Sequence, residues 1–294
     1  MNVGIIGLGV MGGAFSSHLI KNNFIVYGIE PNKKNAKDFI NSNGKLLKDI
    51  KQLFLKCDFI ITSLPSVKSY QDVLEEILKV SKFSVKKTII DMNTISISDK
   101  LNFKEFVKPL NIDLIDCPVS GTGAQAKIAD ISIFASGNKL IVKKSLNILK
   151  AFSKDVIYVG KFGNGMKLKV LANLLVTIHN TAAAEALHLG KLAGLSEKMI
   201  YETLVNSAAT STMLEKRMPL MIKGKYNPPT ASFNIFMKDI DIIRKFINDK
   251  NTSLPTFEAS SLIYDIASSK LSNKIDTAAV YEIIKKKGGK NGKK

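Results

Sequence analysis

The feature that most constrains this chain is a glycine-rich turn close to its N-terminus. The apolar run Val3–Ile6 leads directly into Gly7-Leu8-Gly9-Val10-Met11-Gly12, which has the spacing Gly-x-Gly-x-x-Gly. In this spacing the first glycine allows a tight turn, the second lets a pyrophosphate approach the backbone, and the third lets a helix pack on the strand. A helical pattern follows over Val10–Lys21. This context favours a dinucleotide-binding loop over the alternative of a plain turn.

An acidic residue, Glu30, closes the next strand-like run, Phe24–Ile29. A carboxylate at this point can accept hydrogen bonds from an adenosine ribose and repels a 2′-phosphate. Pro31 occupies the next position, where an arginine could otherwise bind that phosphate. These residues favour NAD over NADP, although Lys33 and Lys34 lie close by. An ordinary solvent-facing glutamate is the alternative.

The pattern up to about residue 160 predicts an α/β fold. Hydrophobic residues make up 45% of the 294 positions, enough for a sizeable core. Short apolar runs alternate with amphipathic segments, which is typical of βαβ units and a mainly parallel sheet. The expected strands are Val3–Ile6, Phe24–Ile29, Phe59–Ser63, Thr88–Asp91, Asp113–Asp116, Ile131–Ala135 and Val156–Val159.

The second part of the chain has a helical pattern. Met166–Leu192 is one long helix candidate, and apolar residues cover more of it than one buried stripe needs. Further helices are expected at Ser196–Ser207, Thr212–Ile222, Asn234–Asn248, Pro255–Ser269 and Asp276–Lys285. The sequence therefore predicts a doubly wound Rossmann-type domain over residues 1–162. An all-α domain over 163–285 follows, joined by the long helix, which we expect to be buried between domains or between the subunits of a homodimer or homotetramer.

The net charge of +18 is concentrated in part at the C-terminus, where residues 286–294 are predicted to form a disordered basic tail. No interleaved aromatic residues or recognition helix accompany these lysines, so we expect no specific nucleic-acid binding. A basic field favours an anionic substrate instead. No stretch approaches the ~18 uninterrupted apolar residues of a membrane span. We also expect no signal peptide and a cytoplasmic protein, with Cys57 and Cys117 as buried thiols and without a metal site.

A second glycine turn, Gly163-Asn164-Gly165, leads into the long helix, which carries Lys169 and Asn173. Residues at positions i and i+4 share a helix face, so these two side chains project together. An ammonium beside an amide can hold and protonate a carbonyl oxygen, and a lysine can act as general acid or base. Lys167 is the competing candidate, but it lies about 160° away around the helix. Two ordinary surface residues are the alternative.

Two further segments are candidates for binding. Ser120-Gly121-Thr122 follows a strand directly and offers hydroxyl and N–H groups suited to a carboxylate, although a plain turn would have the same composition. Lys238-Asp239 lies in an apolar helix of the second domain, where a solvated ion pair is the alternative.

Together these features resemble the β-hydroxyacid dehydrogenase family over nearly the whole chain. Ser63-Leu64-Pro65 resembles the second cofactor-contact turn of that family, and Asp91-Met92-Asn93-Thr94-Ile95-Ser96 resembles the segment that places Thr94 beside the nicotinamide. The resemblance implies that Lys169 is the general acid/base and that Asn173, Ser120, Gly121 and Thr122 bind substrate. It also implies that Leu64, Pro65 and Lys238 contact the cofactor, together with the residues of the first glycine turn.

The sequence departs from the family pattern at two positions, because Thr122 replaces the usual second glycine of the substrate loop and Ala172 stands where an asparagine is common. The implied activity is hydride transfer between a nicotinamide cofactor and a small anionic hydroxy acid or semialdehyde, similar to 3-hydroxyisobutyrate or tartronate semialdehyde. An NADPH-dependent reductase of glyoxylate or succinic semialdehyde and a non-catalytic dinucleotide-binding protein are the alternatives. The larger second domain of 6-phosphogluconate dehydrogenases is incompatible with this length, and imine reductases usually lack the lysine.

Overall fold

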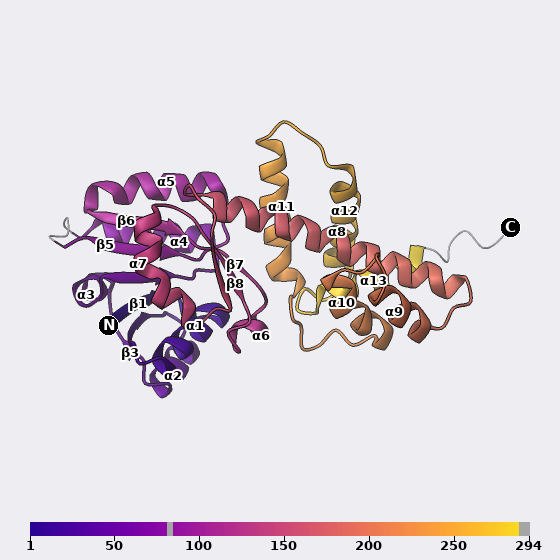
Figure 1. The fold of residues 1–294 in the computed structure, drawn as a ribbon, viewed down its shortest axis with the longest axis horizontal. Helices are drawn as coiled ribbons and strands as arrows, with labels where there is room; N and C mark the ends of the chain where they lie inside the picture. The colour runs from indigo at the N-terminus through magenta and orange to yellow at the C-terminus, as the bar shows by residue number, and fades with distance from the viewer. Residues whose placement is uncertain (81–84, 288–294) are drawn as a thin grey trace. The chain divides into compact units, whose positions relative to one another are not determined.

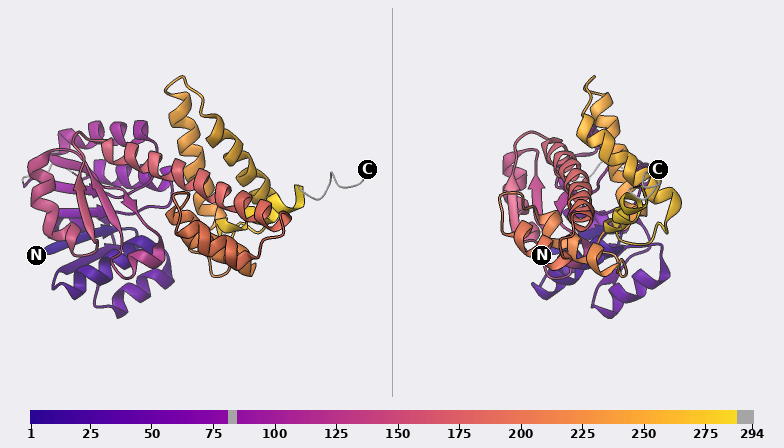
Figure 2. Two further views of the ribbon diagram at one scale, coloured as in Figure 1. Left: turned by 45° about the vertical axis from the view of Figure 1, so that its right-hand side comes forward. Right: turned by 90° about the vertical axis from the view of Figure 1, so that its right-hand side faces the viewer.

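The computed structural model describes residues 1–80 and 85–287, and the chain divides into two compact units, Met1–Lys169 and Val170–Lys294 (Figures 1 and 2). The strands are β1 (Asn2–Ile6), β2 (Ile25–Ile29), β3 (Lys45–Leu46), β4 (Phe59–Thr62), β5 (Lys87–Asp91), β6 (Ile112–Asp116), β7 (Val119–Ser120), β8 (Ser132–Ala135) and β9 (Asp155–Tyr158). The helices of the first unit are α1 (Val10–Lys21), α2 (Lys33–Asn41), α3 (Ile50–Lys56), α4 (Val67–Leu78), α5 (Ile97–Val107), η1 (Lys108–Leu110), α6 (Gly123–Ala126) and α7 (Lys139–Lys150).

Within the described residues, the main sheet of the first unit has six strands in the order β3-β2-β1-β4-β5-β6. Every neighbouring pair is parallel. The order reverses between β1 and β4, and ligands of such sheets bind at the carboxyl ends of the strands beside this reversal. The predicted doubly wound Rossmann-type fold is confirmed.

Each face of this sheet is covered by its own apolar core, because successive strand residues point to opposite faces. Ile5 and Ile61 face a core completed by Phe15 of α1 and Ile148 of α7. The neighbouring residues Ile6 and Ile60 face the other core, which contains side chains from α3, α4 and α5. Strands buried on both faces appear as continuous apolar runs, which is why these strands could be predicted.

Two predicted strands do not join the main sheet. The segments predicted as Ile131–Ala135 and Val156–Val159 form β8 and β9, which pair in parallel in a separate sheet with the unpredicted β7. β7 runs antiparallel to β8. A bridge between Asp116 and Ser136 joins the end of β6 to this second sheet. Strand partners depend on such distant contacts, whereas the apolar pattern gives only the strands themselves.

The second unit is helical, apart from a single bridge between Ser232 and Asp276, over its described residues. The helices of this part of the chain are α8 (Asn164–Leu192), α9 (Glu197–Val205), α10 (Thr212–Lys223), α11 (Phe233–Asn248), α12 (Pro255–Lys270), η2 (Thr277–Ala279) and α13 (Val280–Lys287). Figure 2 shows α11 and α12 side by side, and the rings of Phe236 and Tyr264 meet between them with centroids 5.6 Å apart.

Two predicted boundaries differ from the structure. The first unit ends after Lys169 rather than at residue 162, because the first turn of α8 is hydrogen-bonded to residues of that unit. At the C-terminus, α13 extends to Lys287, so the first two residues of the predicted tail are helical. The rest of that tail, residues 288–294, lies outside the described residues.

By length and composition alone, α8 is the one described helix that could cross a membrane. Within its most apolar window 44% of the residues are buried in the protein. Core helices of soluble proteins pass the same test, so the finding is weak support for a membrane span.

Candidate active site

The glycine turn after β1 leaves open space where a dinucleotide would lie. Gly7 has φ +91°, and a Cβ there would stand 2.3 Å from the carbonyl oxygen of Ser63. A Cβ on Gly12 would stand 2.0 Å from the Gly7 oxygen, so this glycine is required for α1 to approach the turn. A Cβ on Gly9 would meet nothing within 4 Å. No side chain caps α1 at Gly9, so the first N–H groups of the helix are left for an acceptor from outside the helix. The loop therefore fits a pyrophosphate.

Glu30 is held against the same turn. Its Oε2 accepts a hydrogen bond from the backbone N–H of Leu8 at 2.6 Å, and its Oε1 accepts one from Asn32 at 2.8 Å. Lys33 and Lys34 begin α2 and are exposed. The carboxylate therefore lies at the glycine turn and not in open solvent, which is where an acidic residue that selects a ribose must lie.

The two other predicted cofactor segments are tied together by Asn93. Its side-chain oxygen accepts a hydrogen bond from the backbone N–H of Leu64, and its amide donates to Thr62 and Asp91. Thr94 follows this buried asparagine directly and is half-buried. The turn after β4 and the segment after β5 therefore form one rigid surface at the carboxyl edge of the sheet.

A buried charged cluster lies behind this surface, and sequence reasoning missed it. Lys100 of α5 has no exposed side-chain surface, and its Nζ lies 3.2 Å from Asp91 and 2.6 Å from Asp116. Burial lowers the pKa of Lys100, but the attraction of Asp116 and Asp91 outweighs burial and the net shift is upward. Tyr70 donates to Asp91 at 2.8 Å, and burial together with that carboxylate raises the pKa of the Tyr70 hydroxyl well above its usual value. A lysine in a helical pattern ordinarily indicates a solvent-facing position, so no pattern in the sequence indicates this cluster.

The predicted substrate loop is fixed by a capped turn. Gly121 has φ +144°, and a Cβ there would lie 2.6 Å from Ile131. Thr122 caps α6 in a reciprocal capping box: its hydroxyl accepts a hydrogen bond from the backbone N–H of Gln125, and its own backbone N–H donates to the Gln125 side-chain oxygen at 3.1 Å. Ser120 is half-buried at the end of β7. The Thr122 hydroxyl is therefore engaged in the cap, and the threonine contributes bulk to the loop.

The first turn of α8 is anchored to the first unit. The backbone N–H of Met166 donates to Asp116 at 2.9 Å, and that of Gly165 donates to Ser136 at 3.1 Å. A Cβ on Gly165 would stand 2.3 Å from the Phe134 carbonyl oxygen, which explains the glycine at this position. An acidic group at a helix N-terminus satisfies its N–H groups and complements its dipole. Lys169 follows in the next turn, half-buried, as the last residue of the unit.

In the second unit, the amide of Asn173 donates to Asp239 at 3.0 Å. Asn173 is buried in α8, and the half-buried pair Lys238 and Asp239 lies on α11. The structure therefore brings together two residues that the sequence singled out separately, the asparagine of the long helix and the late aspartate.

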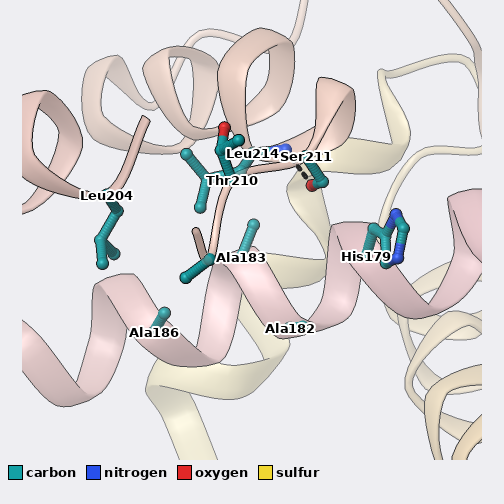
Figure 3. Close-up of a pocket in the computed structure, with 9 residues that line it drawn as sticks. His179, Ala182, Ala183, Ala186, Leu204, Thr210, Ser211 and Leu214 are labelled. Carbon is teal, nitrogen blue, oxygen red and sulfur yellow. Dashed lines mark hydrogen bonds between the residues drawn. The ribbon is translucent and has the colours of Figure 1, made fainter. Parts of the chain in front are cut away.

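A separate hollow of about 270 Å³ lies in the second unit between α8, α9 and the start of α10. Figure 3 shows its alanine floor on α8 beneath Ser211 and Leu214, whose backbone N–H donates to the Ser211 hydroxyl. The lining residues are His179, Ala182, Ala183, Ala186, Leu204, Ala209, Thr210, Ser211 and Leu214. None of them is a predicted site residue, and the lining carries no carboxylate or lysine. We therefore locate the candidate site from the chemistry of the first unit and not from this hollow.

Two family models match the chain in succession. Residues 2–160 match the NAD-binding domain of 6-phosphogluconate dehydrogenase, and residues 163–284 match the NAD-binding domain of NADP-dependent 3-hydroxyisobutyrate dehydrogenase. This chain belongs to the β-hydroxyacid dehydrogenase family. It is accordingly an oxidoreductase that uses a nicotinamide cofactor on hydroxy acids, as the resemblance implied.

Relatives of known activity match this chain over almost its full length. Glyoxylate/succinic semialdehyde reductase 1 of Arabidopsis thaliana is 27% identical over 97% of this chain and 99% of its own length. L-threonate dehydrogenase of Pectobacterium atrosepticum is 28% identical, covering 96% of this chain and 93% of that protein. Among solved structures, 3-hydroxyisobutyrate dehydrogenase of Mycobacterium tuberculosis matches with a TM-score of 0.87 at 21% identity, over 96% of this chain and 98% of that one.

Proposed function

We propose that this dehydrogenase interconverts a small hydroxy acid and its carbonyl partner with NAD, on substrates similar to 3-hydroxyisobutyrate or tartronate semialdehyde, and that Lys169 is its general acid/base. The observation that carries the proposal is the anchored start of α8. Because Asp116 and Ser136 fix the first turn of the helix, the amine one turn later projects from a rigid position. The Lys169 side chain at this position is half-buried, as a proton-transferring group requires.

In this proposal Lys169 takes the hydroxyl proton during oxidation and returns it during reduction. A nicotinamide cofactor, when bound, would accept or supply the hydride. Asn173 orients the reacting oxygen, and its hydrogen bond to Asp239 fixes which way the amide points. Ser120, Gly121 and Thr122 hold the carboxylate end of the substrate. The bulk of Thr122 favours small acids.

For the cofactor, Gly7, Gly9 and Gly12 hold the pyrophosphate, with Leu8, Val10 and Met11 lining the turn. Glu30 is preset at that turn and favours the ribose hydroxyls of NAD over the 2′-phosphate of NADP. Leu64, Pro65, Thr94 and Lys238 complete the proposed cofactor contacts. The Asn93 hydrogen bond to Leu64 supports this grouping, because it fixes two of these segments together.

A second candidate is an NADPH-dependent reductase of glyoxylate or succinic semialdehyde. A relative from Arabidopsis thaliana named glyoxylate/succinic semialdehyde reductase 1 matches almost the full chain, which favours these substrates. The non-catalytic alternative is disfavoured, because such a protein would have no need for both Lys169 and the oriented Asn173.

We also propose a cytoplasmic homodimer or homotetramer that does not bind nucleic acid or membranes. Leu171 and Leu175 on α8 are each 50% exposed, and Leu189 and Leu192 are about two-thirds exposed at its far end. A neighbouring subunit would remove this apolar surface from water, which is favourable at about 25 cal/mol per Å².

The deciding experiment is an assay of purified protein across a panel of small acids, with NAD+ or NADP+ for oxidation and NADH or NADPH for reduction. The panel contains 3-hydroxyisobutyrate, L-threonate and glycerate for oxidation, and glyoxylate, succinic semialdehyde and tartronate semialdehyde for reduction. We expect the highest kcat/KM with the NAD cofactor and either 3-hydroxyisobutyrate or tartronate semialdehyde. A preference for NADPH with glyoxylate or succinic semialdehyde would establish the second candidate. Tight cofactor binding without turnover of any acid would establish the non-catalytic alternative.

A further inference from the structure

The charged cluster behind the cofactor segments joins parts of the chain that are far apart in sequence. Asp91 closes β5 and Asp116 closes β6, so the two carboxylates lie at the carboxyl edge of adjacent parallel strands. Lys100 reaches between them from α5. All three side chains have no exposed surface. In water-free surroundings, one ammonium between two carboxylates fixes the positions of all three groups.

Each carboxylate of the cluster also holds one part of the proposed site. Asp91 accepts hydrogen bonds from the backbone N–H and the side-chain amide of Asn93, the residue that holds Leu64 and precedes Thr94. Asp116 accepts the N–H of Met166 in the first turn of α8. Lys100 therefore pairs both with Asp91, which holds the proposed cofactor segments, and with Asp116, which anchors the helix that carries Lys169.

We propose that Lys100 is a positioning residue of this dehydrogenase: by bridging Asp91 and Asp116, it holds the Thr94 segment and the first turn of α8 at a fixed spacing. The inference rests on the proposed roles of Thr94 and Lys169. Lys100 acts through the two carboxylates and has no role in proton transfer. Its contribution is the alignment of the nicotinamide-side segment with the general acid/base.

A role of Lys100 in stability and a role in positioning predict different values of kcat. Double variants that keep the net charge of the cluster can distinguish the two roles. Lys100→Met alone leaves two facing buried carboxylates, so its melting temperature should fall for either reason. The double variants Lys100→Met/Asp91→Asn and Lys100→Met/Asp116→Asn remove one charge of each sign. Their cluster has the same net charge as the native one, but no cation joins its two halves.

The matched control is Lys87→Met. Lys87 begins β5 at the opposite edge of the same sheet, is also buried, and pairs with Asp58 at 2.8 Å. Lys87→Met removes a buried lysine from β5, the strand that ends at Asp91, and leaves the proposed site residues unchanged. We expect a lower melting temperature and an unchanged kcat for this control.

The experiment measures melting temperature, NADH dissociation constant and kcat for the wild type, both double variants and the control, with the best substrate of the panel. We expect the double variants to melt close to the control and to bind NADH within about threefold of the wild type, because the glycine turn is untouched. Their kcat should be lower by at least about tenfold, since misplacing reacting groups by about 1 Å can cost two orders of magnitude.

A wild-type kcat in double variants that melt close to the control would overturn the proposal, because Lys100 would then serve stability alone. Failure of both double variants to fold, with the control folded, would overturn it for the same reason. Lys169→Ala is assayed in parallel. Near-normal turnover in that variant contradicts the proposed function itself, whereas an inactive Lys169→Ala beside fully active double variants contradicts only the inference about Lys100.

Discussion

The carboxylate of Glu30 accepts a hydrogen bond from the backbone N–H of Leu8, with 2.6 Å between Oε2 and the nitrogen. This bond links the end of β2 to the turn between β1 and α1. The residue proposed to select the ribose therefore also shapes the loop proposed to hold the pyrophosphate. A carboxylate held in this way cannot swing aside to admit a 2′-phosphate without releasing the loop.

Replacing Glu30 should accordingly change the choice of cofactor. In Glu30→Gln the side chain can still accept from Leu8, but it no longer repels a 2′-phosphate. We expect the ratio of kcat/KM with NADPH to kcat/KM with NADH to rise at least about tenfold, consistent with one charged hydrogen bond worth about 1.5–3 kcal/mol. Steady-state kinetics with both cofactors measure the ratio. Asp38→Asn, an exposed acid on α2, serves as the control and should leave it unchanged.

Removing the proposed general acid/base should abolish most turnover. We expect Lys169→Ala to lower kcat by at least about 100-fold, the usual contribution of a positioned acid or base. Cofactor affinity should stay within about twofold of the wild type, because the amine acts on the substrate proton. Lys167→Ala is the matched control, since Lys167 is exposed and its Nζ donates to the side-chain oxygen of Asn164 at 3.3 Å. Equal kcat in the two variants would contradict the assignment.

The substrate range should respond to Thr122. Thr122→Gly removes the side chain from the substrate loop, while glycine is tolerated at a helix N-cap at a cost of a few tenths of a kcal/mol. We expect kcat/KM for bulkier acids, relative to glyoxylate-sized ones, to rise about five- to tenfold, as for a pocket enlarged by one or two methyl groups. Thr122→Ser keeps the capping hydroxyl and should give a smaller change. A ratio that stays at the wild-type value in both variants would place Thr122 outside the pocket.

Cys57 should make the protein less stable at alkaline pH. Burial raises the pKa of this thiol from 9.0 to about 12, although the Lys87 ammonium acts in the opposite direction. As pH rises through this interval the unfolded thiol ionises first, so the unfolded state binds fewer protons and the free energy of unfolding falls. Cys57→Ser should flatten that fall between pH 9.0 and about pH 12, the interval between the unfolded and the folded pKa of the thiol. Urea unfolding followed by far-ultraviolet circular dichroism measures it, because the chain contains no tryptophan.

The same burial predicts that a thiol reagent near neutral pH labels Cys57 only after unfolding, since the thiolate is the reactive form. Rapid labelling of Cys57 in the folded wild type would contradict both expectations.

The sequence by itself determined the elements whose formation depends on neighbouring residues. The helix predicted at Val10–Lys21 has those bounds in the structure, because the glycine turn starts it and the apolar spacing continues it. The predicted strands of the main sheet agree with the observed ones to within about one residue at each end, since strands buried on both faces form continuous apolar runs. The resemblance to the β-hydroxyacid dehydrogenases needed only the order of short motifs, and the family models confirm it.

Only the tertiary structure decided which groups became partners. The two-residue strands β3 and β7 have no pattern of their own and exist because a neighbouring strand offers free backbone groups. Likewise, nothing around Lys100 in the sequence distinguishes it from a solvent-facing lysine. Its burial depends on Asp91 and Asp116, which the fold brings to adjacent strand ends. Helical and strand periodicity are properties of consecutive residues, whereas the burial of a charge depends on partners far away in the chain.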